Sequence, residues 1–136
     1  MIRLFRVSIV TLFSAVMVGA ALPPAPVWAE EKAPARPAYI ALGEFTINLP
    51  NKGDQLSYAV ISITIEAVPA AATDLRAVEP RLKETVMRRL MAMADRGVLQ
   101  PGHTDLIAVK QALISSLTEL QPDSVRDVLI VRLLYG

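Results

Sequence analysis

Apolar and polar residues alternate in two runs of the chain, residues 39–49 and residues 56–68. The apolar positions that recur at every second residue are Phe45, Ile47 and Leu49 in the first run and Ile61, Ile63 and Ile65 in the second. A period of two sends successive side chains to opposite faces of a sheet, so each run predicts a strand with one buried face. The segment 50–55 is rich in turn-forming residues, so we expect an antiparallel β-hairpin. A hairpin alone is marginally stable in water, and later segments must cover its apolar face.

The alternation in the first run changes phase at Gly43. Ile40 and Leu42 occupy even positions, whereas the apolar residues from Phe45 onward occupy odd ones. An extra residue in one strand shifts which side chains face the core, and glycine is frequent at such places. The sequence therefore predicts a β-bulge at Gly43.

A period close to that of an α-helix follows in two further segments. The first helix is expected from Pro80 to about Ala94, and its buried positions are Leu82, Val86, Leu90 and Met93. Its opposite face carries Arg81, Glu84, Arg88 and Arg89, with Glu84 placed four residues before Arg88 to form an ion pair. The second helix is expected after a cap at Thr104 or Asp105, and its buried positions are Leu106, Val109, Leu113, Leu117 and Leu120. Residues 95–102, with two glycines and Pro101, form the loop between the helices.

The last segment, residues 125–135, is apolar at both odd and even positions. A strand of this kind is covered on both faces, so it lies either at the centre of the sheet or against another subunit. The predicted fold is α+β: a small three-stranded, mainly antiparallel sheet in the order β-β-α-α-β, with the helices packed on one face. The order of the strands within the sheet does not follow from the pattern.

The N-terminal residues 1–29 have the layout of a secretory signal peptide. Arg3 and Arg6 precede an uncharged apolar run, residues 7–22, and the small residues Val27 and Ala29 precede Glu30. An uncleaved membrane anchor is the alternative. The run reaches the length of a spanning helix only by including the proline-rich stretch after it, which favours cleavage over anchoring. In either case the arginines stay in the cytoplasm, which places the rest of the chain on the periplasmic side of the inner membrane. Residues 30–37 form a tether rich in proline and charge, and residues 38–136 form the folded domain.

The composition narrows the possible functions. Without Arg3 and Arg6, 12 of the 14 basic residues remain against 13 acidic ones, so there is no basic surface for nucleic acid. The chain has no cysteine and a single histidine, His103, which lacks the partners of a metal site. No nucleophile turn and no glycine-rich phosphate loop is present. We therefore expect a protein that is not an enzyme and that has no cofactor and no small-molecule substrate.

Two groups of residues are candidates for an interaction surface. The surplus apolar residues are Tyr58 and Val60 in the second strand and Leu129, Val131, Leu133 and Tyr135 in the last one. In a self-assembling scaffold these residues would be buried between copies, because monomers seldom expose large apolar patches. In a binding module they would instead line a cavity within one copy. Arg88 and Arg89 could contact acidic groups of a partner, and a solvated helix face is the alternative interpretation.

The order of these segments resembles that of the FliL family of proteins associated with the flagellar basal body. The resemblance covers residues 39–135 and rests on the segments YIALGEFTINL (39–49), YAVISITIE (58–66), PRLKETVMRRL (80–90) and VRDVLIV (125–131). It implies a periplasmic domain, similar to stomatin/prohibitin-type domains, that assembles into a homo-oligomeric ring around the stator of the bacterial flagellum and supports rotation, motility and chemotaxis. Family members usually keep an uncleaved transmembrane helix, whereas this chain has a candidate cleavage site after Ala29, and the family supplies no catalytic residue.

Overall fold

Three strands and three α-helices follow one another in residues 35–51, 53 and 55–136, which are the residues that the computed structural model describes. The elements are β1 (Ala38–Leu49), β2 (Ser57–Ala67), the 3₁₀ turn η1 (Pro69–Ala71), α1 (Ala72–Ala77), α2 (Glu79–Asp95), α3 (Leu106–Leu120) and β3 (Val125–Tyr135). They belong to a unit that extends from Pro34 to Gly136. The α+β class is confirmed, and the three strands and the two expected helices follow in the predicted order, with the short helix α1 as an additional element before α2.

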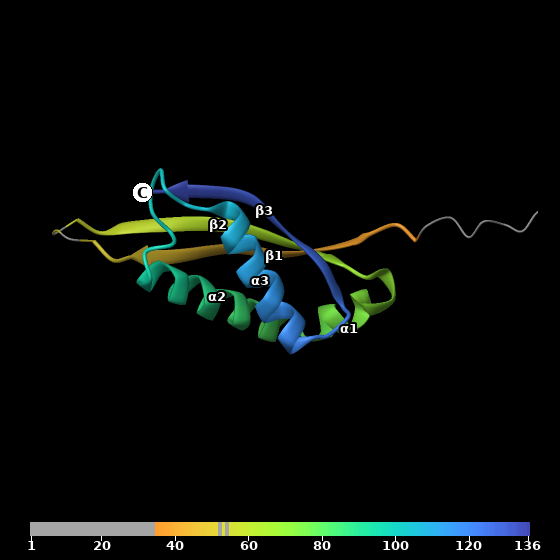
Figure 1. The fold of residues 1–136 in the computed structure, drawn as a ribbon. Coiled ribbons are helices and arrows are strands. Elements are labelled where there is room, and N and C mark those ends of the chain that lie inside the picture. Colours follow the sequence, from red (N-terminus) through yellow and green to blue (C-terminus); the bar gives the residue numbers. More distant parts are fainter. Residues whose placement is uncertain (1–34, 52, 54) are drawn as a thin grey trace, which may run out of the picture. The chain divides into compact units, whose positions relative to one another are not determined.

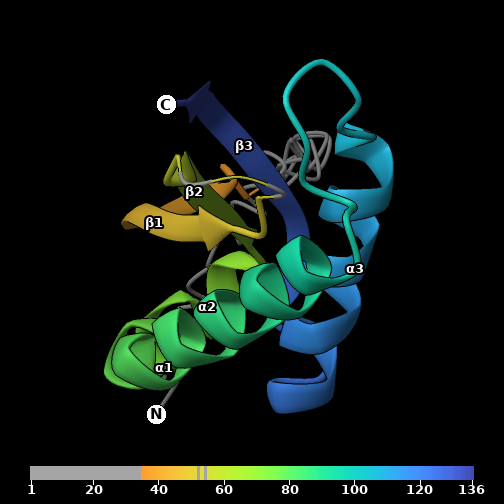
Figure 2. The same cartoon turned by 90° about the vertical axis from the view of Figure 1, so that its left-hand side faces the viewer.

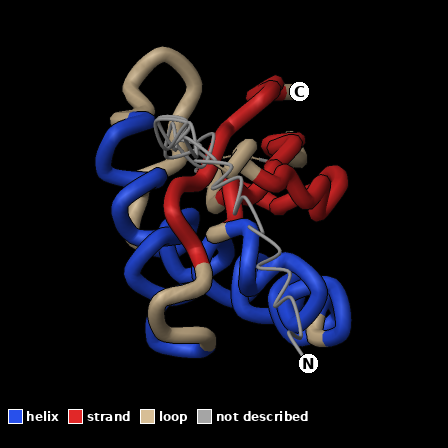
Figure 3. The backbone as a smooth tube through the Cα atoms, turned by 90° about the vertical axis from the view of Figure 1, so that its right-hand side faces the viewer, coloured by secondary structure: helices blue, strands red, loops and turns tan. Residues whose placement is uncertain are grey.

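The three strands form one antiparallel sheet in the order β1-β2-β3, with β2 at the centre. Helices α2 and α3 lie on the same side of this sheet, as Figures 1 and 2 show. Helix α2 packs against β1, α3 packs against β3, and the two helices pack against each other. Seen from the other end, the helices remain grouped on one side of the strands (Figure 3). The core lies in the single layer between sheet and helices.

The bulge expected at Gly43 is present. Ala41 pairs with Thr64 and Gly43 pairs with Ile63, so Leu42 is an extra residue in β1. Gly43 has a φ of 94°, a conformation that residues with a side chain rarely adopt. As a result, Ile40 before the bulge and Phe45 after it are both buried, although they occupy positions of opposite parity.

The predicted buried positions of the two helices are confirmed, except at the start of α3. The expected positions Leu82, Val86, Leu90 and Met93 of α2 are buried, and so are Val109, Leu113 and Leu117 of α3. The prediction for Leu106 was wrong, because this residue opens the first turn of α3, which is exposed up to Ala108. Leu106 is 47% exposed and Ile107 is 70% exposed. Leu99, in the loop before α3, is 1% exposed and is a core residue that the pattern did not reveal.

Strand β3 is an edge strand, so the first alternative for it, a central position, was wrong. Val128 is its only fully buried residue. Val131 lies between Ile130, which pairs with Ile63, and Arg132, which pairs with Ser62, and so forms a second bulge. The strand has apolar residues at both odd and even positions because the bulge changes which positions face the core. Ile130 before the bulge and Leu133 after it both face the core, although one is even and the other odd, and the strand is therefore not covered on both faces.

The expectations for residues 1–29 and for most of the tether lie outside the described residues. Among residues 35–51, 53 and 55–136, no helix combines the length and the apolar character that crossing a membrane requires.

Candidate interaction surface

One face of the sheet is covered by the helices and the other is open. In β2 the side chains alternate between the buried residues Ala59, Ile61, Ile63, Ile65 and Ala67 and the less buried residues of the open face. On the open face, Val60 of β2 pairs with Leu134 of β3, and Tyr58 lies two residues before Val60. Tyr58 is 44% exposed and Leu134 is 51% exposed. We call Tyr58, Val60 and Leu134 the apolar end of the open face.

Polar side chains cross the middle of the same face. Glu44 of β1, Ser62 of β2 and Arg132 of β3 are neighbours in the pairing of the strands. Ser62 Oγ donates a hydrogen bond to Glu44 Oε1 at 3.2 Å, and Arg132 forms an ion pair with the same carboxylate. Glu44 and Arg132 keep about half of their side-chain surface exposed, 53% and 50%. Exposed ion pairs contribute little to stability. The row formed by Glu44, Ser62 and Arg132 lies between the apolar end and the rest of the open face.

The structure brings together only some of the apolar residues that the sequence singled out. Tyr58, Val60 and Leu129 belong to the open face, and the bulged Val131 is 67% exposed. Leu133 and Tyr135 pair with the core residues Ile61 and Ala59 and pack against the core instead. The hydroxyl of Tyr135 also contacts Thr104 Oγ1, which ties the end of β3 to the loop before α3. Leu133 and Tyr135 therefore stabilise the fold and do not belong to the open surface.

Leu134 is a surface residue that the sequence reasoning missed. Counting parity from Val128 and Ile130 places Leu134 on the core side, but Arg132 shares the same parity. A charged residue in the middle of a buried row is costly, so its position there is a signal that the strand changes phase between Ile130 and Arg132. The bulge at Val131 is that change, and it turns Leu134 to the open face.

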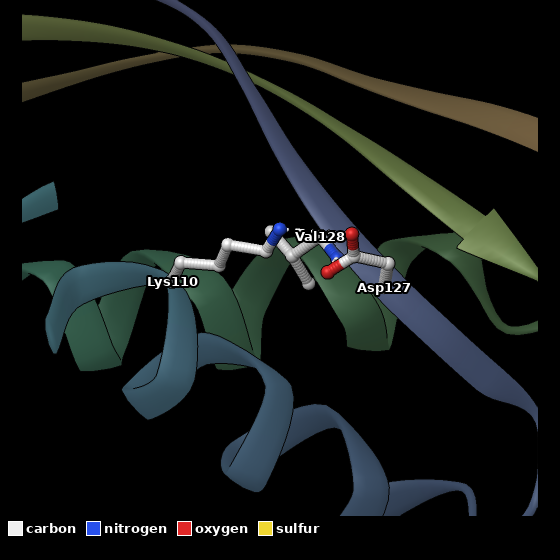
Figure 4. A network of polar contacts seen from close by, with 3 residues as sticks. All are labelled: Lys110, Asp127 and Val128. Carbon is white, nitrogen blue, oxygen red and sulfur yellow. Dashed lines mark hydrogen bonds and ion pairs between the residues drawn. The ribbon is translucent and has the colours of Figure 1, made fainter. Parts of the chain in front are cut away.

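The outer edge of β3 carries an ion pair with α3. Lys110 Nζ lies 2.8 Å from Asp127 Oδ2, and Asp127 Oδ1 accepts a hydrogen bond from the backbone N–H of Val128 at 2.8 Å (Figure 4). The hydrogen bond from Lys110 lowers the pKa of Asp127 below its ordinary value of 3.8, against the opposing effect of partial burial, and the Val128 N–H adds to the lowering. Charges and bulges on an edge strand discourage pairing with a further strand. The first half of the β3 edge is therefore protected from pairing with a strand of another molecule.

A hollow of about 300 Å³ opens beside this ion pair, between α3 and β3. Its lining residues are Leu106, Ile107, Lys110, Val128, Leu129 and Ile130. Leu129 is the one residue of the predicted apolar set that borders this hollow, whereas Tyr58 and Val60 lie at the other end of the strand pair. Leu129 therefore belongs to the open face and also borders this open hollow at the sheet edge.

The two candidate arginines lie on α2, on the helical side of the molecule. Arg88 is exposed and forms the predicted ion pair with Glu84, which is confirmed. Arg89 is half-buried beside α3. Both are separated from the open face by the thickness of the sheet, so the arginines and the apolar residues do not form one surface.

The remaining sequence candidate for chemistry, His103, is exposed in the loop before α3. Within the part of the chain that the structure describes, no group of three or more His, Cys, Asp and Glu side chains is placed to hold a metal ion.

Comparison of the chain with protein-family models and with curated proteins gives no match. The assignment of a function therefore depends on the fold, the surface and the resemblance described above.

Proposed function

We propose that this chain is a FliL-type accessory of the flagellar motor, a periplasmic scaffold that assembles into a ring at the basal body and stator. The resemblance over residues 39–135 suggests the family, and the observed order of two strands, three helices and a third strand is compatible with it. A fold of stomatin/prohibitin type is part of the same proposal. The observation that carries it is the open face of the sheet, on which Tyr58 and Leu134 are exposed in adjacent strands.

An open apolar sheet face suits a protein that holds partners. Contiguous apolar side chains on a surface mark sites of protein association, and no helix of the described residues covers the apolar end. A ring held by such contacts would act on the motor through linkage. If it binds the conducting state of the stator more tightly than the resting state, it shifts the population toward conduction by that difference in affinity.

Deletion of residues 38–136 in the cell that carries this chain tests the proposal. Flagella should still assemble, because the ring supports rotation and not the export of flagellin. Swimming should be impaired most clearly in viscous medium, where the load on the stator is high. Normal swimming under load, or a genome without a flagellar stator, would refute the flagellar role.

The second candidate is a periplasmic binding module without a flagellar role. The hollow between α3 and β3 favours it, because Leu106, Ile107 and Leu129 give that hollow an apolar wall within a single copy. A deletion strain with normal motility, together with a strictly monomeric protein, would support the module over the ring.

A further inference from the structure

The charged row on the open face of the sheet has a negative and a positive side. Glu44 of β1 and Arg132 of β3 lie on either side of Ser62, which belongs to the central strand β2. They pair with each other, yet they keep 53% and 50% of their side-chain surfaces exposed. A carboxylate accepts several hydrogen bonds and a guanidinium donates five, so both groups have capacity left for a second partner.

The apolar end lies directly beside this row. Val60 and Leu134 are paired with each other, and Thr46 of β1 pairs with Val60 on its other side. Tyr58 comes next, and Leu56, two residues before it, is 94% exposed. Helices α2 and α3 lie on the other side of the strands (Figure 2). Exposed apolar side chains bordered by polar ones are typical of a surface that contacts another protein.

A second copy of this chain fits the open face in one of two symmetric arrangements. Two identical sheets that stack face to face are related by a two-fold axis in the plane between them. When the axis runs along the strands, β1 lies opposite β3 of the second copy and β2 lies opposite β2. Glu44 of each copy then faces Arg132 of the other, and the two apolar ends meet. When the axis runs across the strands, Glu44 faces Glu44 and Arg132 faces Arg132, so like charges repel.

The charges at the far end of the face are compatible with the first arrangement. Glu66 of β2 would lie opposite Glu66 of the second copy, but it is only 19% exposed and Arg126 Nη1 lies 3.7 Å from its Oε1. Asp127 is similarly paired with Lys110. These carboxylates are therefore compensated within each copy, whereas Glu44 and Arg132 are the most exposed charges of the paired rows.

We propose that the open face binds the open face of a second copy, with the two-fold axis along the strands and Glu44 of each copy paired with Arg132 of the other. The outer strands differ little in length from the 11 residues of β2, so the face measures roughly 37 Å by 14 Å. Two copies would bury about 1,000 Å² together, which is near the lower limit of specific interfaces. We therefore expect a weak pair whose formation depends on concentration.

This inference rests on the part of the proposed function that makes the chain a self-assembling scaffold, and it does not depend on the flagellar role. A face-to-face pair is a closed unit, so a ring would need a further contact between pairs. The two proposals fail separately. A chain that does not pair would leave the motility of the deletion strain to be judged by itself, and normal motility would not affect the pairing.

The test measures energy transfer between copies of the full chain. The chain has no cysteine, so Glu119→Cys, at an exposed position of α3, carries either a donor or an acceptor dye. Energy transfer should rise with concentration in the otherwise unaltered chain. Glu44→Arg and Arg132→Glu each place like charges opposite each other in a pair, so association should be at least tenfold weaker in either variant alone. A mixture of the two variants should associate again, because opposite charges then face each other across the interface.

The recovery in the mixture separates contacts between copies from contacts within one copy. In both single variants the ion pair within the chain is lost, and mixing does not restore it. A structural role of Glu44 and Arg132 within one copy therefore predicts no recovery.

A double variant keeps the test decisive even where the single variants fail to fold. Glu44→Arg/Arg132→Glu retains the ion pair within the chain in reversed order. It should associate with itself as strongly as the unaltered chain does. It should not form mixed pairs with the unaltered chain, because each of the two contacts would then join like charges.

Three results would overturn the proposal. The first is the absence of energy transfer at every concentration, or its appearance only after a different protein is added. The second is equal energy transfer in all single variants and mixtures, as expected if copies associate through the apolar run of residues 7–22 instead. The third is free mixing of the double variant with the unaltered chain.

Discussion

At the scale of single residues, extra residues in the edge strands decide which of their side chains reach the core. Gly43 shifts the phase of β1, and Val131 shifts the phase of β3. Without the first shift, Ile40 and Leu42 would face the open side while Phe45, Ile47 and Leu49 faced the helices. Without the second, Arg132 would be turned toward the helices. Strand β1 thus depends on one extra residue to keep its apolar side chains on the covered face, and β3 depends on Val131 and on a further extra residue, Arg126, between the paired residues Val125 and Asp127.

Substitution of Gly43 by alanine should destabilise the domain. A Cβ at this position would have free space around it, but the φ of 94° is unfavourable for any residue with a side chain. The free energy of unfolding should fall by about 1–2 kcal/mol, as measured by urea denaturation. Gly53→Ala is the matched control, because Gly53 also has open space and no φ in the left-handed region. Equal effects of the two substitutions would show that the backbone conformation at Gly43 is not the cause.

Leu99 and Leu106 offer a second comparison at this scale. Both belong to the region between α2 and the body of α3, yet Leu99 is 1% exposed and Leu106 is 47% exposed. Leu99→Ala should lower the free energy of unfolding by about 2–5 kcal/mol, because it leaves a cavity in the core. Leu106→Ala should change it by less than about 1 kcal/mol, since little buried surface is lost. Thermal or urea unfolding of both variants checks the difference, and a reversed order would contradict the burial of the loop.

At the scale of elements, α3 is fixed at its start by Asp105. The side chain accepts hydrogen bonds from the backbone N–H groups of Ile107 at 3.0 Å and of Ala108 at 3.1 Å. These groups have no partner within the helix, so the carboxylate replaces water at an exposed end. The other expected cap, Thr104, bonds instead to Gln100 and Tyr135 and holds the preceding loop.

Removal of this cap should cost about 1 kcal/mol of stability in Asp105→Ala. Asp105→Asn should lose much less, because asparagine caps helices about as well as aspartate. Unfolding by urea measures both variants. A loss in Asp105→Asn as large as in Asp105→Ala would mean that the charge, and not the capping geometry, stabilises the start of α3.

The contact between α3 and β3 should make stability depend on pH. The pKa of Asp127 is lower in the folded chain than its ordinary value of 3.8, so the folded state favours the ionised carboxylate. The resulting stabilisation is present above about pH 3.8 and disappears as the pH falls through the lower pKa of the folded state. Lys110→Met should bring the midpoint of the Asp127 titration closer to 3.8, as followed by carboxyl ¹³C NMR. An unchanged midpoint would show that Lys110 is not the main cause of the lowered pKa.

The strands and helices could be predicted from the sequence because the apolar residues of each recur at a regular spacing. The alternation around Ile61 and the helical spacing of Leu82, Val86 and Leu90 are local properties, and they predict strand, helix and buried face correctly. The edge position of β3 does not follow, since it depends on how β2 pairs on both sides. The burial of Leu99 and the half-buried position of Arg89 depend on how the two helices and their loop pack, which no short pattern records.

At the scale of the whole molecule, the helices cover one face of the sheet and leave the other face open. The two sides of the molecule therefore present surfaces of different character. The apolar end of the open face suits contacts with other protein surfaces, and the opposite side of the sheet is covered by α2 and α3. The Lys110–Asp127 pair and the bulges protect the sheet edges from pairing with further strands. Association through the open face is therefore expected in preference to extension of the sheet.

Leu134→Lys tests whether copies associate through this face. Leu134 is 51% exposed, so the lysine can remain in solvent and folding should be preserved, while an apolar contact with another copy would be lost. Light scattering of residues 30–136 over a concentration series should show assemblies for the unaltered chain and monomers for Leu134→Lys. Ile107→Lys is the matched control, because Ile107 is 70% exposed but lies on α3, so its assemblies should persist. Equal masses for the unaltered chain and Leu134→Lys at every concentration would exclude assembly through the apolar end.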